Sequence, residues 1–78
     1  MKAPVDYLGK KFFPAYGGQW AGEFPHMLVS DKKWNRVIQR IYFAPDNFEM
    51  AWENVCAICD LMNAEYDKAQ KGEHLNNA

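Results

Sequence analysis

The stretch DNFEMAWENVCAICDLMNAEYDKAQKG, residues Asp46 to Gly72, decides the fold of this chain, because it predicts one long helix with apolar residues on two faces. The apolar residues of the first face follow the three-and-four spacing that stacks side chains along one side of an α-helix. These residues are Phe48, Ala51, Trp52, Val55, Ile58, Cys59, Met62 and Tyr66. We expect this face to form the helical side of the core.

Both ends of the stretch carry helix-boundary signals. Asp46 and Glu49 have the spacing of a capping box, in which each side chain accepts a hydrogen bond from the backbone amide of the other. Pro45 prevents an earlier helix from continuing into this one. Gly72 is a typical residue at the end of a helix. The sequence therefore predicts a helix that starts at Asp46 and stops at Gly72.

A second apolar cluster lies nearly opposite the first on a helical projection. It consists of Met50, Ala57, Leu61 and Ala64. An acidic row divides the two faces along one flank, and it consists of Glu49, Glu53, Asp60 and Asp67. A small protein could cover the second cluster with its own N-terminal half. Alternatively, the cluster binds a partner protein or a second copy of the chain, because small alanines allow another helix to approach closely.

Length and composition limit the possible classes of protein. We expect the 78 residues to form a single small domain over residues 1–72, with a flexible tail at residues 73–78. Hydrophobic residues make up 49% of the chain and aromatic residues 15%, too many for a disordered polypeptide. A chain of this size buries only about 60% of its unfolded surface, so a partner would add stability. The net charge of -1 gives no overall attraction to nucleic acid or anionic lipid.

Cys56 and Cys59 form a C-x-x-C motif, which can belong to a redox pair or to half of a zinc site. The motif lies in the middle of the predicted helix, far from the helix N-terminus that would lower a thiol pKa. Only His26 and His74 could add histidine ligands, and no second metal-binding pair lies near either. We expect two reduced packing cysteines, with no metal and no cofactor.

The chain shows neither a secretion signal nor a long apolar span. We therefore expect a cytoplasmic protein without a membrane partner. Nucleophilic catalysis would need a Cys or Ser beside a His with an orienting carboxylate, and no spacing in the sequence predicts such a set. We do not expect an enzyme.

The middle of the chain is compatible with two folds. HMLVS and RVIQRIYF, separated by the polar DKKWN, predict a β-hairpin. We prefer this α+β arrangement, with a short antiparallel hairpin or three-stranded sheet packed on one long C-terminal helix. The alternative is a mostly α helical hairpin, because residues 31–43 also fit helical spacing and Ser30 could be an N-cap. The hairpin places Val37, Ile41 and Phe43 on one face, and Arg36, Ile38, Arg40 and Tyr42 on the other.

Two further groups of residues are candidate binding sites. Prolines and glycines interrupt the N-terminal third, whose aromatic rings could close the core or could form a recognition loop that presents Tyr16 and Trp20. A basic and aromatic cluster could track phosphates and stack bases, which makes a small nucleic-acid-binding protein an alternative function. This cluster consists of Lys32, Lys33, Trp34, Arg36, Arg40 and Tyr42.

The run IYFAPDNFEMAWENVCAICDLMNA resembles the ending of short phage- or prophage-encoded accessory proteins, in which an edge strand meets a capped C-terminal helix. Such proteins often bind and block a host enzyme or defence complex, as anti-CRISPR proteins do, and commonly lack catalytic residues. The resemblance implies a non-enzymatic inhibitor or adaptor in the host cytoplasm. A self-assembling dimeric structural subunit is a third possible function.

Overall fold

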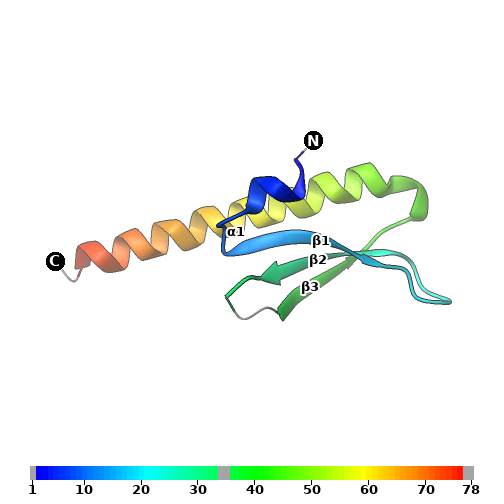
Figure 1. The fold of residues 1–78 in the computed structure, drawn as a ribbon, viewed down its shortest axis with the longest axis horizontal. Helices are drawn as coiled ribbons and strands as arrows, with labels where there is room; N and C mark the ends of the chain where they lie inside the picture. The colour runs from blue at the N-terminus through cyan, green and yellow to red at the C-terminus, as the bar shows by residue number, and fades with distance from the viewer. Residues whose placement is uncertain (1, 34–35, 77–78) are drawn as a thin grey trace.

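The fold is α+β, with a three-stranded antiparallel sheet packed against one long C-terminal helix (Figure 1). The computed structural model describes the backbone of residues 2–33 and 36–76 and the side chains of residues 2–33 and 36–71. The elements in chain order are η1 (Pro4–Tyr7), β1 (Phe12–Gly18), β2 (His26–Asp31), β3 (Arg36–Tyr42), η2 (Pro45–Asn47) and α1 (Phe48–Asn76). The predicted hairpin is therefore confirmed, and the helical-hairpin alternative is wrong.

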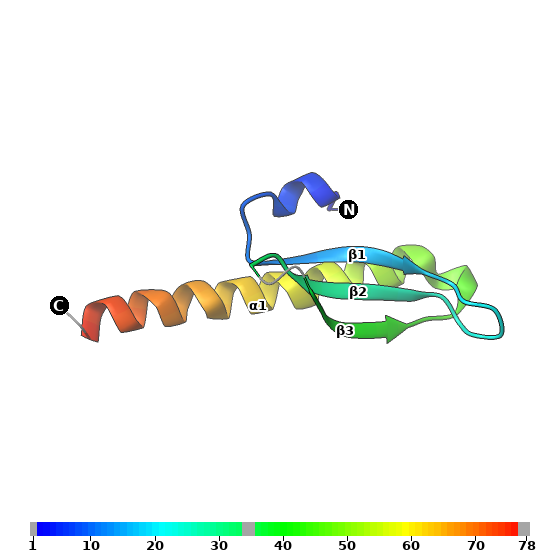
Figure 2. The same cartoon turned by 60° about the horizontal axis from the view of Figure 1, so that its bottom comes forward.

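The sheet has the order β1-β2-β3, so β2 is the central strand (Figure 2). β1 and β2 pair antiparallel from Phe12 opposite Asp31, and β2 and β3 pair antiparallel as far as His26 opposite Tyr42. α1 lies along one face of the sheet in both views, and the opposite face carries no helix (Figures 1 and 2).

A bulge in β3 corrects the predicted side-chain pattern of that strand. Val29 pairs with Gln39, but the next residue, Ser30, pairs with Val37, so Ile38 is an extra residue in the ladder. An inserted residue reverses the face to which the preceding side chains point. Ile41 therefore packs against the core as predicted, as does Phe43 just beyond the strand. Val37 does not, and it is exposed.

The C-terminal helix lies over the predicted stretch, but the ends of α1 differ from the predicted residues. Asp46 lies in η2, α1 begins at Phe48, and the hydrogen bonds of the described residues include none from the side chain of Asp46 or Glu49. α1 also continues through Gly72 to Asn76, into the segment predicted to be a tail. Glycine ends a helix where it adopts positive φ, whereas inside a helix it only costs about 1 kcal/mol relative to alanine.

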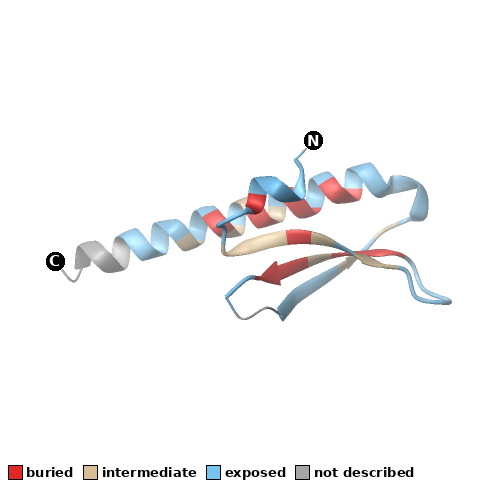
Figure 3. Ribbon diagram, in the orientation of Figure 1, coloured by how far each residue is buried: buried red, intermediate tan, exposed pale blue. Residues whose placement is uncertain are grey.

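The core forms where β2 faces α1 (Figure 3). β2 contributes Met27 and Val29, which are fully buried, and η1 adds Tyr7 from the side. The buried apolar residues of α1 are Ala51, Trp52, Val55, Cys56 and Cys59. Ile58 and Met62 are partly buried against this core. The predicted core face of the helix is thus confirmed along its central turns.

The molecule is elongated because α1 is much longer than the strands. Its 29 residues span about 44 Å at 1.5 Å per residue, whereas the seven residues of β1 span about 23 Å. The radius of gyration is 14.5 Å, against about 11.5 Å for a compact chain of 78 residues. The C-terminal part of α1 therefore extends beyond the sheet (Figure 1).

Candidate interaction surface on helix α1

The face of α1 that points away from the sheet is apolar and open. Met50 and Leu61 are 63% and 66% exposed, and the small residues Ala57 and Ala64 beside them are also exposed. The N-terminal half of the chain therefore leaves this cluster uncovered. The structure brings the four residues together on one side of a single rigid helix, as the sequence predicted.

Two further residues extend this cluster into a regular pattern. Asn54 and Lys68 are exposed and complete a repeat of alternating four- and three-residue steps along α1. Apolar residues at such spacing form the contact line of paired helices, and an Asn or Lys within the line specifies register at a cost in stability. This line contains two such polar residues, Asn54 and Lys68. We call this line the outer face. It consists of Met50, Asn54, Ala57, Leu61, Ala64 and Lys68.

An acidic row borders the outer face on one side. Glu53, Asp60 and Asp67 recur every seven residues, in the positions that flank a helix-pairing line and choose its partner. Glu53 and Asp67 are exposed, and Asp60 is partly buried. Glu49 is exposed near the start of α1. These residues place carboxylates along one border of the outer face, where Asp60 pairs with Lys2 and Asp67 lies near the lysines of β1 and the β2–β3 turn.

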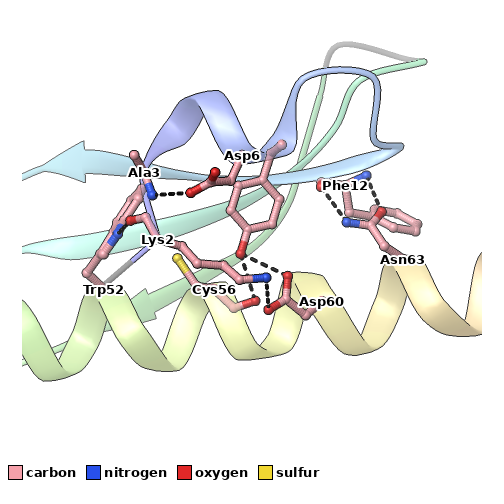
Figure 4. Close-up of polar contacts among 9 residues, drawn as sticks. Lys2, Ala3, Asp6, Phe12, Trp52, Cys56, Asp60 and Asn63 are labelled. Atoms are coloured by element: carbon pink, nitrogen blue, oxygen red, sulfur yellow. Dashed lines mark hydrogen bonds and ion pairs between the residues drawn. The ribbon is translucent and has the colours of Figure 1, made fainter.

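Asp60 also has a structural role, because it anchors the N-terminal segment to α1 (Figure 4). Its carboxylate forms an ion pair with the Lys2 ammonium at 2.8 Å and accepts a hydrogen bond from the Tyr7 hydroxyl at 3.0 Å. The Tyr7 hydroxyl also lies 3.2 Å from the backbone oxygen of Cys56, and Trp52 Nε1 donates to the Lys2 carbonyl at 2.6 Å. The segment therefore docks along the flank of α1, where Lys2 and Asp6 line pockets that Ala57 and Ala64 also line. Met50 and Leu61 stay exposed beyond it.

These contacts shift the acid–base properties of the groups involved. The hydrogen bond from Lys2, followed by that from Tyr7, lowers the pKa of Asp60. Burial raises the pKa of the Tyr7 phenol well above its usual range, and the neighbouring Cys56 and Asp60 add to this effect. Asp60 is therefore charged and Tyr7 neutral at physiological pH, which suits a structural anchor.

The predicted aromatic recognition loop is not a single surface. Tyr16 lies on the helix side of the sheet, where its ring contacts Phe43 and Phe48. Trp20 is 56% exposed in the β1–β2 connection and packs edge-on against His26. Met27 faces the core, and successive side chains of a strand point to opposite faces, so His26 points to the face without a helix. Trp20 packs against His26 and therefore lies on the opposite side of the sheet from Tyr16.

The predicted nucleic-acid-binding residues are also divided. Arg36 begins β3 beside the turn that holds Lys32 and Lys33, whereas Tyr42 ends β3 next to His26, at the other end of the sheet. Arg40 is exposed between them on the face without a helix, opposite Leu28. Trp34 lies outside the described residues.

The structure instead brings together two Lys-Lys pairs that are distant in the sequence. Lys10 and Lys11, which directly precede β1, line a pocket of about 430 Å³ together with Lys32 and Lys33 from the β2–β3 turn. Gly9, Asn63, Tyr66 and Asp67 complete its lining. We call this the lysine pocket. Sequence reasoning did not single out Lys10 and Lys11, and it placed Tyr66 on the core face of the helix. The repeated Lys-Lys pair is a visible signal once β1 and β2 are known to be antiparallel.

The C-x-x-C motif contributes to packing. Cys56 and Cys59 are buried and unpaired in the core, as predicted. Burial, with a smaller effect from Cys56, raises the pKa of the Cys59 thiol to about 12, so this thiol stays protonated at neutral pH. Within the part of the chain that the structure describes, no three His, Cys, Asp or Glu side chains gather in a way that could hold a metal ion.

Comparisons of the chain with protein-family models, with curated proteins and with solved structures found no match. Among the described residues, no helix combines the length and apolar character needed to cross a membrane. The geometry of the exposed faces is therefore the basis for a functional proposal.

Proposed function

We propose that this chain is a non-enzymatic protein-binding module, an inhibitor or adaptor, and that the outer face of α1 receives a helix of its partner. The observation that carries the proposal is the exposure of Met50 and Leu61, at 63% and 66%, within a regular helix-pairing pattern. Helix association buries apolar residues at this spacing, and the alanines between them permit a close approach.

The surface area of the molecule agrees with a missing partner. The chain exposes 5713 Å², against about 4,900 Å² for a compact monomer of 9.1 kDa. The overhanging end of α1 adds to this excess, because residues 67–71 are exposed on all sides.

Charge favours a different protein over a second copy. If two copies paired antiparallel through the outer face, their acidic rows would lie opposite each other. If they paired parallel, Asp60 of one copy would lie near Glu65 of the other. Like charges across such an interface are unfavourable, whereas a basic residue opposite Glu53 would be attracted. The partner helix is therefore apolar along one line and basic beside it.

The resemblance to phage accessory proteins favours a host enzyme or defence complex as the source of this helix. Blocking requires only that the bound module cover a working surface of the target. No catalytic group on the module is needed for that action.

The test uses two synthetic helical peptides with the same apolar line, one flanked by lysines and one by glutamates. We expect the protein to bind the lysine-flanked peptide and not the glutamate-flanked one. Leu61→Glu should weaken binding at least tenfold, because it places a carboxylate in the apolar line. Gln70→Glu adds the same charge to α1 away from the outer face and should leave binding unchanged.

Light scattering on the unbound protein provides the second measurement. We expect the 9.1 kDa monomer mass. A dimer of about twice that mass that Leu61→Glu converts to monomer would assign the outer face to self-association and overturn the proposal. Equal binding of both peptides, or of neither, would also overturn it.

A further inference from the structure

We propose that the lysine pocket binds a phosphate group of a nucleotide ligand. The pocket lies at the end of the sheet, beside α1, and adjoins the acidic row through Asp67. None of its lining residues belongs to the outer face itself. Its charge, its construction and its size carry the inference.

The lysine pocket gathers positive charge from two segments of the chain. Four lysines line it, and the carboxylate in the lining is Asp67. Asp31 Oδ2 lies 3.8 Å from Lys11 Nζ, and Asp60 acts electrostatically on Lys10. Lys10 and Lys32 are exposed members of the cluster. Gathering like charges is unfavourable unless an anion lies among them, and lysine ammonium groups are common ligands of phosphate oxygens.

The backbone holds the lysines in place. The amide of Lys32 donates to the carbonyl of Lys11 at 2.8 Å, which joins the two Lys-Lys pairs side by side. The amide of Lys33 donates to Asp31 Oδ1 at 2.9 Å, and this bond shapes the turn. Asp31 is 5% exposed. Both segments that supply ammonium groups are therefore fixed by hydrogen bonds before any ligand arrives.

α1 forms the remaining wall of the pocket. The Lys11 ammonium lies 4.5 Å from the centroid of the Tyr66 ring, and that ring meets Phe12 edge-on at 6.3 Å. Lys11 is thus held in position by an aromatic ring and by Asp31. Lys10 and Lys32 are exposed at the pocket and are the residues best placed to contact an anion.

The size of the pocket favours a nucleotide over a bare ion. Its volume of about 430 Å³ falls within the range of roughly 300–1,000 Å³ that small-molecule sites occupy. The phosphate can belong to a free nucleotide or to a single-stranded nucleic acid, since both present the same oxygens. The other basic residue near this end, Arg36, begins β3 next to the turn.

The experiment compares adenosine triphosphate with a labelled single-stranded oligonucleotide, at low salt and without metal. Amide chemical shifts of the wild-type protein should change at residues 9–11, 32–33 and 66–67 on addition of at least one of them. Lys10→Gln and Lys32→Gln should each weaken binding about tenfold. For the oligonucleotide, each substitution should also reduce the slope of log affinity against log salt concentration by about one.

Lys71→Gln is the matched control, because Lys71 is an exposed lysine of α1 outside the pocket. It should change the affinity less than twofold, as should Leu61→Glu on the outer face. Binding of the oligonucleotide alone assigns a nucleic-acid strand, and binding of the triphosphate alone assigns a free nucleotide. Absence of binding to both, shift changes elsewhere, or equal weakening by Lys71→Gln would overturn the proposal.

Discussion

The carboxamide of Asn63 pairs with both backbone polar groups of Phe12. Asn63 Oδ1 accepts a hydrogen bond from the Phe12 amide at 2.8 Å, and Asn63 Nδ2 donates to the Phe12 carbonyl at 2.9 Å (Figure 4). The side chain thus replaces a neighbouring strand at the outer edge of β1. Asn63 is 7% exposed, so these bonds are shielded from water and link the helix directly to the sheet.

Asn63→Ala should lower the free energy of unfolding by about 1–3 kcal/mol, because it leaves two polar groups of Phe12 without partners in a shielded site. Urea unfolding at neutral pH measures the change. Asn54→Ala removes an exposed carboxamide from the same helix and should change the stability by less than about 0.5 kcal/mol. Equal effects of the two substitutions would show that the Phe12 pairing contributes little.

Gly17→Ala should destabilise the fold by about 1–3 kcal/mol, because a Cβ at this position would overlap the ring of His26, and overpacking forces neighbours to move. His26 is 2% exposed between Trp20 and Tyr42, so the ring has little room to shift. The check is a double-mutant cycle. In a His26→Ala background the same glycine substitution should cost much less, and additive effects would contradict the proposed clash.

Acid should remove the stability that the Asp60 anchor provides. The pKa of Asp60 is lower in the folded protein than in the unfolded chain, chiefly because of the hydrogen bond from Lys2. A carboxyl group whose pKa is lowered by folding stabilises the folded protein at pH values above its unfolded-state pKa of about 3.9. This stabilisation is lost as the pH falls through the pKa of the group in the folded protein. Asp60→Asn should therefore reduce stability at neutral pH and have less effect near about pH 3.

Urea unfolding at the two pH values tests this prediction. Glu65→Gln is the control, because Glu65 is an exposed acidic residue of α1 outside the anchor. The difference in the free energy of unfolding between wild type and Asp60→Asn should become smaller at the lower pH. The corresponding difference for Glu65→Gln should not follow that trend. A constant difference across the pH range would mean that the Asp60 charge does not stabilise the fold.

The two cysteine thiols should react with a thiol-specific disulfide reagent only when the protein opens. Both are buried, and burial raises the pKa of Cys59 to about 12, so the reactive thiolate is scarce and shielded. We expect labelling of the native protein to be at least about a hundredfold slower than labelling in urea, since opening the core costs several kcal/mol. Rapid labelling of one thiol in native buffer would contradict this prediction and would favour a redox function of the C-x-x-C motif.

The sequence predicted the elements whose patterns depend on local spacing. The three-and-four repeat from Ala51 to Met62 identified the core face of α1, and the turn between HMLVS and RVIQRIYF identified the hairpin. The opposite apolar cluster on α1 was also predicted. Whether it is exposed depends on the path of the N-terminal segment, which the sequence pattern did not predict. That path depends on Tyr7 and Lys2 reaching Asp60, more than fifty residues away.

Features that depend on tertiary contacts were missed. The bulge at Ile38 changes which side of β3 faces the core, and no turn or glycine in the strand marks it. The start of α1 differs from the predicted one because a 3-10 turn, Pro45–Asn47, precedes it, and α1 continues through Gly72. The lysine pocket requires the antiparallel alignment of β1 with β2, which composition and charge patterns do not supply.

The pairing of Asn63 with Phe12 also restricts the order in which the chain can assemble during synthesis. β1 and β2 leave the ribosome first, but most of the buried apolar side chains that cover them belong to residues 51–59, and Asn63 comes later still. The nascent sheet therefore has no hydrophobic core of its own, and contacts between distant residues form slowly. Folding of the sheet therefore requires the buried residues of α1, so a chain cut short before residues 51–59 would be unfolded and open to proteases.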